Sequence, residues 1–214
     1  MRRAPGCTMT MDQNKAFLTE RLTTFSELTA NDIAVSLPFW KTRKINKGDF
    51  FNMQNIVCSD LGLVIKGIFR IYYIDAKTQE ERNVFFFSEK QFIVSFRSFL
   101  HRMPCYYFIQ ALEDSEIISI QHHDINYLYT TYKPWERFGR RIAELFFEYS
   151  QSSIEDQLFS TVEDRYVKLV QNHPQLVERI PLYHISSYLN IKNPSLSRIR
   201  KRLEARDRAG VKPQ

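Results

Sequence analysis

The chain has 214 residues, of which 43% are hydrophobic and 14% are aromatic. This length leaves room for one large domain or two modest ones, and we expect two. The apolar content suffices for a core, which excludes disordered and collagen-like classes. No apolar run approaches the roughly 20 residues that cross a bilayer, so we expect a cytoplasmic protein without a membrane partner. Cys7, Cys58 and Cys105 form no closely spaced pair, which argues against a disulfide framework and a zinc site.

The net charge of +6 comes from one end of the chain. Residues 192–212 contain eight basic and two acidic residues, a balance equal to that of the whole chain. A neutral body with a basic end favours a negatively charged partner, either nucleic acid or a membrane surface. A short basic run also serves as a solubilising tail, and charge alone does not separate the two interpretations.

Residues 1–14 are polar and irregular, and methionines at positions 9 and 11 suggest an alternative start. We therefore treat this segment as a disordered tail or a remnant of cloning. From Lys15 to Leu28 apolar residues recur at helical spacing, and residues 29–32 resemble the capped start of a second helix. A small helical lead-in is predicted.

The next part of the chain predicts strands. Runs rich in β-branched and aromatic residues alternate with polar turns at residues 63–74, 83–87, 92–96, 106–112 and 116–120. Short strands at such regular spacing indicate a sandwich or a barrel. We expect residues 15–133 to form an N-terminal β-barrel with flanking helices.

A long helix is predicted from Pro134, because proline is favoured in the first turn of a helix. Five apolar residues then follow at alternating spacings of three and four, the rhythm of a helix that faces a partner helix; they are Trp135, Phe138, Ile142, Leu145 and Tyr149. Phe146 and Phe147 widen this stripe, so the helix can also lie on the barrel of its own chain. We expect residues 134–160 to be a dimerisation helix, with packing on the chain's own barrel as the alternative.

Residues 161–214 predict a small all-helical domain. Thr161 and Asp164 can cap its first helix, which the His173-Pro174 pair ends. Two short helices follow, within residues 182–189 and 194–203, and the asparagines between them tolerate the left-handed backbone of a sharp turn.

The second of these short helices has the character of a DNA recognition helix. One face is apolar, and the other combines small residues near its start with cations, as entry into a major groove requires. The candidate DNA-binding residues are Lys192, Asn193, Ser195, Ser197, Arg198, Lys201 and Arg202. We expect His184, in the first helix, to contact either packed side chains or a DNA phosphate.

Several phrases of the sequence resemble the Crp/Fnr family of bacterial transcription regulators, especially its Bacteroidetes-type members. They are KGDF at 47–50, LVIKGIFRIY at 63–72, RY at 165–166, RIPLYHI at 179–185 and SLSRIR at 195–200. The resemblance covers about residues 15–206. It implies an α+β fold with a cyclic-nucleotide-binding-like jelly-roll barrel, a long dimer helix and a C-terminal helix-turn-helix domain. It further implies a homodimer that binds double-stranded DNA, with RNA polymerase and an unknown small-molecule effector as additional partners.

The chain departs from the family pattern where an effector would bind. Members that bind cyclic AMP carry a Gly-Glu pair for the ribose and an Arg-Ser pair for the cyclic phosphate. Those positions hold Val94, Ser95, Cys105 and Tyr106 here. We expect a degenerate pocket that does not bind cyclic AMP, with Arg97 and Arg102 as the alternative phosphate ligands. Six aromatic residues are expected to converge on it: Phe92, Phe96, Phe99, Tyr106, Tyr107 and Phe108.

The sequence contains no motif of a catalytic site. A glycine-rich phosphate loop, HExxH and GxSxG are absent, and the adjacent His122 and His123 point apart, so they cannot chelate a metal together. We expect neither enzymatic activity nor a cofactor. The favoured hypothesis is a homodimeric, sequence-specific DNA-binding transcription regulator. The alternative is a small-molecule sensor barrel whose basic helix docks a protein partner, while a cupin-type enzyme is disfavoured because only His101 lies among the strands.

Overall fold

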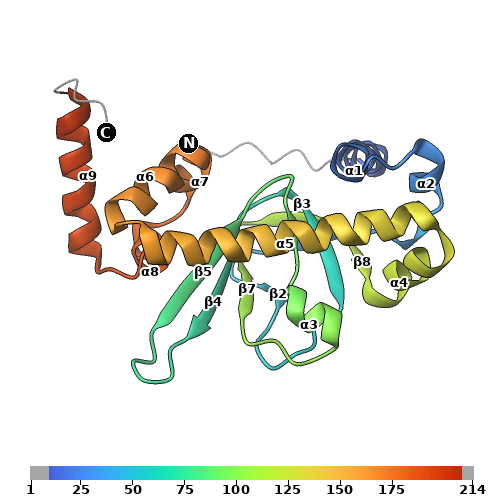
Figure 1. Ribbon diagram of the computed structural model, residues 1–214, viewed down its shortest axis with the longest axis horizontal. Coiled ribbons are helices and arrows are strands. Elements are labelled where there is room, and N and C mark those ends of the chain that lie inside the picture. The colour runs from blue at the N-terminus through green and yellow to red at the C-terminus, as the bar shows by residue number, and fades with distance from the viewer. Residues whose placement is uncertain (1–9, 209–214) are drawn as a thin grey trace.

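The computed structural model describes residues 10–208 (Figure 1). The N-terminal elements are α1 (Met11–Ser26), α2 (Ala30–Ala34) and the short 3₁₀ helix η1 (Leu37–Phe39). The strands are β1 (Lys41–Ile45), β2 (Phe50–Asn52), β3 (Asp60–Lys66), β4 (Phe69–Ile74), β5 (Glu81–Phe87), β6 (Phe92–Ile93), β7 (Phe108–Ala111) and β8 (Ser115–Gln121). The remaining helices are α3 (Phe96–His101), α4 (His122–Thr131), α5 (Lys133–Phe159), α6 (Val162–Asn172), α7 (Pro174–Arg179), α8 (Leu182–Tyr188) and α9 (Asn193–Arg208).

The first helix begins earlier than the sequence predicts, so a disordered tail over residues 1–14 is wrong for its last part. Thr10 caps α1, because its hydroxyl accepts from the Gln13 N–H while the Gln13 side chain accepts from the Thr10 N–H. Asn14 is buried against Thr42 and Glu116. The polar composition of this segment includes a capping box, which starts the helix at Met11. Residues 1–9, with Cys7, lie outside the described residues.

Two four-stranded antiparallel sheets form the barrel, in the orders β1-β8-β3-β6 and β2-β7-β4-β5. The run at 63–74 is not one strand, because the chain turns between β3 and β4 at Gly67, whose φ of 112° is one that side chains rarely adopt. A Cβ at Gly67 would also overlap the Ser115 side chain. The run at 92–96 likewise gives only the two residues of β6 before α3 begins.

The long helix α5 has 27 residues and runs along the barrel to the C-terminal helices (Figure 1). The main core fills the barrel and includes the inner face of α5, whereas a second core joins barrel residues Ile68 and Phe86 to α6, α7, α8 and α9. The last helix, α9, lies at the opposite end of the molecule from α1 and α2 (Figure 1). Among the described helices, none has the length and apolar character that a bilayer span requires.

Candidate nucleic-acid interface

The helices α8 and α9 form the sharp hairpin that the sequence predicts. Asn190 takes the left-handed conformation at φ 57°, and the Ile191 N–H donates to the Ser186 carbonyl over 2.9 Å. The Ser186 hydroxyl in turn donates to Oδ1 of Asn193, the first residue of α9. Leu189 and Leu196 close the hairpin from inside, both at most 1% exposed. The angle between the two helices is therefore fixed by hydrogen bonds and by packing.

The outer face of α9 carries most of the candidate DNA-binding residues. Lys192, Asn193, Ser197, Arg198 and Lys201 are exposed, and Ser195 is half-buried. Among the described side chains, residues 10–206, neither Arg198 nor Lys201 forms an ion pair, and both cations are exposed. The small serine side chains leave the start of the helix narrow, as insertion into a groove requires.

Arg202 differs from the other candidates because it already has an anionic partner. Its guanidinium pairs with Glu163 at the start of α6, and Arg206 reaches the other carboxylate oxygen of Glu163 over 3.0 Å. These pairs hold α9 against α6. Arg202 is accordingly less available to a phosphate than the sequence suggests.

The first helix of the hairpin, α8, covers the open edge of the sheet at β5. The Asn83 N–H donates to the Ser187 hydroxyl over 3.1 Å, and that hydroxyl donates to the Glu81 carbonyl over 2.7 Å. The Asn83 side chain donates to the His184 carbonyl over 3.0 Å. Main-chain groups of an edge strand that would otherwise face water are thus satisfied by α8.

His184 is 4% exposed and lies over Arg70, a buried cation on β4. Its Nδ1 accepts from Arg70 Nη1 at 3.2 Å and from Asn83 Nδ2 at 3.3 Å. Burial, together with the adjacent Arg70 charge, lowers the pKa of His184 to about 4. His184 is therefore a neutral packing residue and not a phosphate contact. We call Arg70, Glu81, Asn83, His184 and Ser187 the edge-strand latch.

A second contact, the Arg179 clamp, joins the C-terminal helices to the barrel. Arg179 makes a forked pair with Glu89, at 2.7 and 3.0 Å, and also pairs with Glu113. The Gly67 N–H donates to Glu89 over 2.9 Å. Although burial alone would raise it, the pKa of Glu89 is lowered, because these donors favour the carboxylate. Arg179, Glu89 and Glu113 are the three residues of the clamp.

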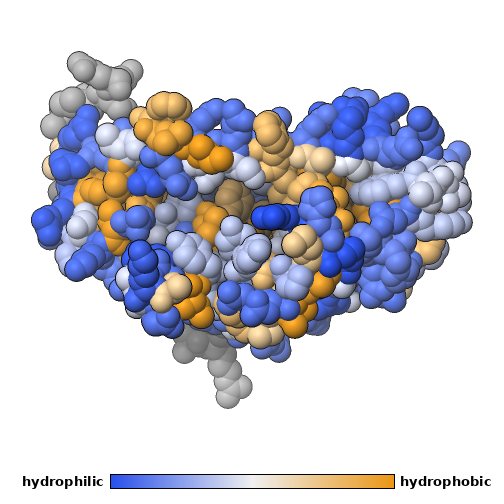
Figure 2. Space-filling view, turned by 60° about the horizontal axis from the view of Figure 1, so that its bottom comes forward, coloured by the Kyte–Doolittle hydropathy of each residue, from blue (hydrophilic) through white to orange (hydrophobic). Residues whose placement is uncertain are grey.

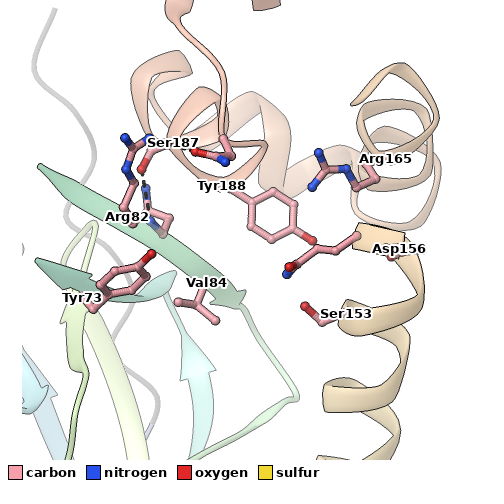
Figure 3. Close-up of a pocket in the computed structure, with 11 residues that line it drawn as sticks. Tyr73, Arg82, Val84, Ser153, Asp156, Arg165, Ser187 and Tyr188 are labelled. Carbon is pink, nitrogen blue, oxygen red and sulfur yellow. Dashed lines mark hydrogen bonds between the residues drawn. The ribbon is translucent and has the colours of Figure 1, made fainter. Parts of the chain in front are cut away.

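A cavity of about 320 Å³ lies beside α8, between the barrel, α5 and α6. Figure 3 shows Tyr73 and Val84 on the barrel side, Ser153 on α5, and the Tyr188 ring between them. Arg165 reaches the same cavity from α6, and its Nε is buried without a hydrogen-bond partner among the described residues. The cavity therefore adjoins the contact between α8 and β5, and Asn83 and Ser187 line it as well.

Most of the residues expected to line an effector pocket are buried among the chain's own side chains. Val94, Ser95 and Cys105 are at most 8% exposed, and Ser95 Oγ lies 2.8 Å from Cys105 Sγ. Phe92 and Phe99 are buried, and Phe96 stacks on Phe146 of α5 with centroids 5.0 Å apart. Phe108 of β7 instead stacks on Tyr72 of the adjacent strand β4, with ring centroids 5.0 Å apart.

The expectation that all six aromatic side chains converge is wrong, because Tyr106 is 60% exposed and Tyr107 38%. Of the two alternative phosphate ligands, Arg97 is exposed and lies over Tyr106, 5.9 Å from the ring centroid. Arg102 donates to the Cys58 carbonyl over 2.7 Å and to Ser59, which commits its guanidinium to the barrel wall.

The dimer residues named from the sequence mostly face the chain's own core. Trp135, Phe138 and Ile142 are at most 2% exposed, and Trp135 donates to the Asp32 carbonyl over 2.9 Å. Leu145 and Tyr149 are partly buried against the same core. Trp135, Phe138 and Ile142 have no free surface for a second subunit, so the predicted dimer interface through these three residues is wrong.

A different stripe of α5 is free. Phe147, Ile154 and Leu158 are 67%, 58% and 69% exposed, and Phe159 at the end of the helix is 83% exposed. Spacings of seven and four place the first three on one face, with Gln151 between them. Figure 2 shows hydrophobic side chains gathered in groups on a surface that is otherwise mostly hydrophilic.

The described residues hold no group of three or more His, Cys, Asp or Glu side chains suited to a metal. His122 contacts Asn126, and His123 pairs with Asp124 at 3.0 Å, so the two adjacent histidines have separate partners. Burial raises the pKa of the Cys58 thiol to about 11, which keeps it protonated and unreactive.

A scan against protein-family models gives no match, and neither does a sequence search of curated proteins. Solved structures do match. A protein assigned to the Crp/Fnr family from Eubacterium rectale is 14% identical, with a TM-score of 0.67 over 87% of this chain and 88% of that chain. The Thermus thermophilus catabolite activator protein is 19% identical, with a TM-score of 0.53 over 89% of each chain. The chain spans only 43% of the cAMP-bound PfPKA-R that it matches, at a TM-score of 0.50 and 14% identity.

The fold thus defines a two-part α+β protein, in which a cyclic-nucleotide-binding-like barrel and a long helix precede a helix-turn-helix unit. This is the fold of the Crp/Fnr transcription regulators, and it agrees with the class predicted from the sequence.

Proposed function

We propose that this protein is a homodimeric, sequence-specific DNA-binding transcription regulator without enzymatic activity. The observation that carries the proposal is the outer face of α9, where Arg198 and Lys201 are exposed and unpaired within the described chain. Guanidinium groups in a major groove read guanine, and ammonium groups bind phosphate. The shared fold of Crp/Fnr regulators supports the same function.

The dimer is proposed to form along the exposed stripe of Phe147, Ile154 and Leu158. Three large apolar side chains at heptad-like spacing on a 27-residue helix suit the same stripe of a second copy. A two-fold axis along α5 places one hairpin at each side, so the operator should contain two half-sites about 34 to 36 Å apart.

The barrel is proposed to act without cyclic AMP. Val94 stands where the protein backbone would have to approach the nucleotide, and Cys105 stands where a cation would have to face its phosphate. Both side chains are buried. Arg102, one of the two nearby cations, donates to the Cys58 carbonyl. Any effector of this barrel therefore belongs to another chemical class.

The test begins with selection of an operator from random duplexes, followed by affinity measurements at several salt concentrations. Arg198→Ala should cost about 1 to 3 kcal/mol on the selected operator and relax the preference at one base pair. Lys201→Ala should weaken all sequences alike and make the salt dependence shallower by about one unit. Lys133→Ala is the matched control, since this exposed lysine starts α5 and pairs with Glu136.

Two results would overturn the proposal. If selection yields no duplex that is preferred over competitor DNA, the protein is not a sequence-specific binder. If Arg198→Ala and Lys201→Ala lower operator and competitor affinity by the same factor, α9 is an electrostatic anchor that reads no base.

A further inference from the structure

The barrel makes directional contacts with the segment of α7 and α8 at two separate places. On one side the edge-strand latch ties α8 to β4 and β5, and on the other the Arg179 clamp ties the residues before α8 to the loops that hold Glu89 and Glu113. With one attachment point on α8 and one at Arg179, the last residue of α7, the segment cannot pivot about either one. Since α8 fixes α9 through the Asn190 turn, the barrel also fixes the direction of α9.

Apolar packing alone would not fix that direction. Ile68 and Phe86 pack beneath the helices, but such contacts are non-directional and allow sliding. Tyr188 packs on Phe86 with ring centroids 5.6 Å apart but also lines the cavity, so this flank of α8 is only partly packed. Buried hydrogen bonds, in contrast, lose their partners once the helix turns by a fraction of its width.

The latch includes a buried charge that needs its partners. Arg70 is only 6% exposed at its side chain and is satisfied by Glu81 at 2.5 Å, by Gln110 and by His184. If α8 moved away, Arg70 would lose the His184 acceptor without gaining full access to water. The latch therefore favours one docked position of α8 over others that bury similar apolar area.

We propose that Arg179 and the edge-strand latch are positioning residues for DNA recognition, which set the distance between half-sites that the dimer accepts. This rests on the proposed function as a DNA-binding dimer. A change of one base pair between half-sites moves the two recognition helices relative to each other by about 3.4 Å and by about 35° around the duplex. A docked α8 cannot follow such a movement, whereas a released domain on the Ser160 connection between α5 and α6 can.

The test measures affinity for duplexes that carry the selected half-sites with spacers of the native length and one or two base pairs shorter or longer. We compare the wild type, Arg179→Gln, Ser187→Ala and their double variant, with Arg179→Lys as the conservative variant. Arg43→Gln is the matched control, because it breaks a half-exposed pair with Asp60 at 2.9 Å, on the other sheet. A duplex with a single half-site reports the intrinsic affinity of one hairpin.

For the wild type and Arg43→Gln, a spacer change of one base pair should weaken binding at least about tenfold. For the double variant the same change should weaken binding less than about threefold, with single half-site affinity within about twofold of the wild type. Arg179→Gln alone should lie between them, and Arg179→Lys should recover part of the discrimination. Arg179 is half-exposed, so this single variant tests the proposal even where the double variant unfolds.

Identical spacing profiles for the wild type and Arg179→Gln would overturn the proposal. So would a loss of single half-site affinity with a shallower salt dependence in Arg179→Gln, since that result would make Arg179 a phosphate contact. Failure of the wild type to prefer any selected duplex would instead reject DNA recognition itself, and the single half-site duplex separates these two failures.

Discussion

The buried His184 makes a specific prediction about stability and pH. In the folded protein its Nδ1 accepts hydrogen bonds from Arg70 and Asn83, so a proton on Nδ1 would meet a cation and lose both bonds. The groups that face it are Arg70, which opposes the charge, and Glu81, which favours it, with the Tyr183 ring 4.0 Å from its own. The result is a pKa of about 4 in place of the ordinary 6.5.

The sign follows from proton linkage. Between pH 6.5 and pH 4 the unfolded chain binds a proton at this histidine and the folded chain does not, so stability falls as pH falls. The stability that depends on a neutral His184 is fully present above pH 6.5 and is lost as the pH approaches 4. From the folded and unfolded pKa values of His184, the free energy of unfolding at pH 5 should be lower than at pH 7.5 by at most about 2 kcal/mol.

The assay is urea unfolding at pH 7.5 and pH 5, for the wild type and for His184→Asn. Asparagine places Oδ1 where Nδ1 accepts, so it keeps the acceptor and removes the titration. His122 and His173 also have pKa values lowered by burial, but their effect is common to both proteins and cancels in the comparison. The wild type should lose about 1 to 2 kcal/mol more than the variant. Equal losses would show that His184 does not stay neutral inside the latch.

Three further outcomes are expected. The double variant Ile154→Asp, Leu158→Asp should give monomers by light scattering, and a dimer that persists would place the interface elsewhere. Ile142→Asp should instead lower the free energy of unfolding by more than about 3 kcal/mol, because it buries a charge in the barrel core. Gly67→Ala should destabilise the protein by more than about 2 kcal/mol, and Gly48→Ala by about 1 kcal/mol, since both need positive φ but only Gly67 lacks space for a Cβ; equal urea midpoints would contradict this. Calorimetry should detect no binding of cyclic AMP, and a saturable micromolar isotherm would point to Arg97 as the phosphate ligand.

Local signals in the sequence predict the local structure well. Thr161 and Asp164 form the capping box that their spacing predicts, and Asn190 takes the left-handed turn. The His173-Pro174 pair separates α6 from α7. In each case the residues that decide the conformation lie within four positions of one another, so their physics is visible in the sequence.

Tertiary contacts were predicted less well, for a physical reason. The stripe from Trp135 to Ile142 has the periodicity of a buried helix face, but periodicity does not say whether a barrel or a second chain buries it. The latch joins His184 to residues 101 and 114 positions away, and no local pattern marks Asn83 or Arg70 as its partners. A polar residue directly before an apolar run, as Asn83 is before Val84 and the three phenylalanines of β5, was the available signal that this edge is covered.

Internal pairing divides the basic residues of the C-terminal part into two groups. Arg179 is neutralised by Glu89 and Glu113, and Arg202 and Arg206 share Glu163, so these guanidinium groups hold helices in place. Arg198 and Lys201 have no such partner among the side chains of residues 10–206, and both are exposed. Net charge alone would assign all of them to DNA. Internal pairing removes Arg202 and Arg206 from the eight basic residues of the C-terminal stretch, so the salt dependence of DNA binding should report fewer than eight phosphate contacts per subunit.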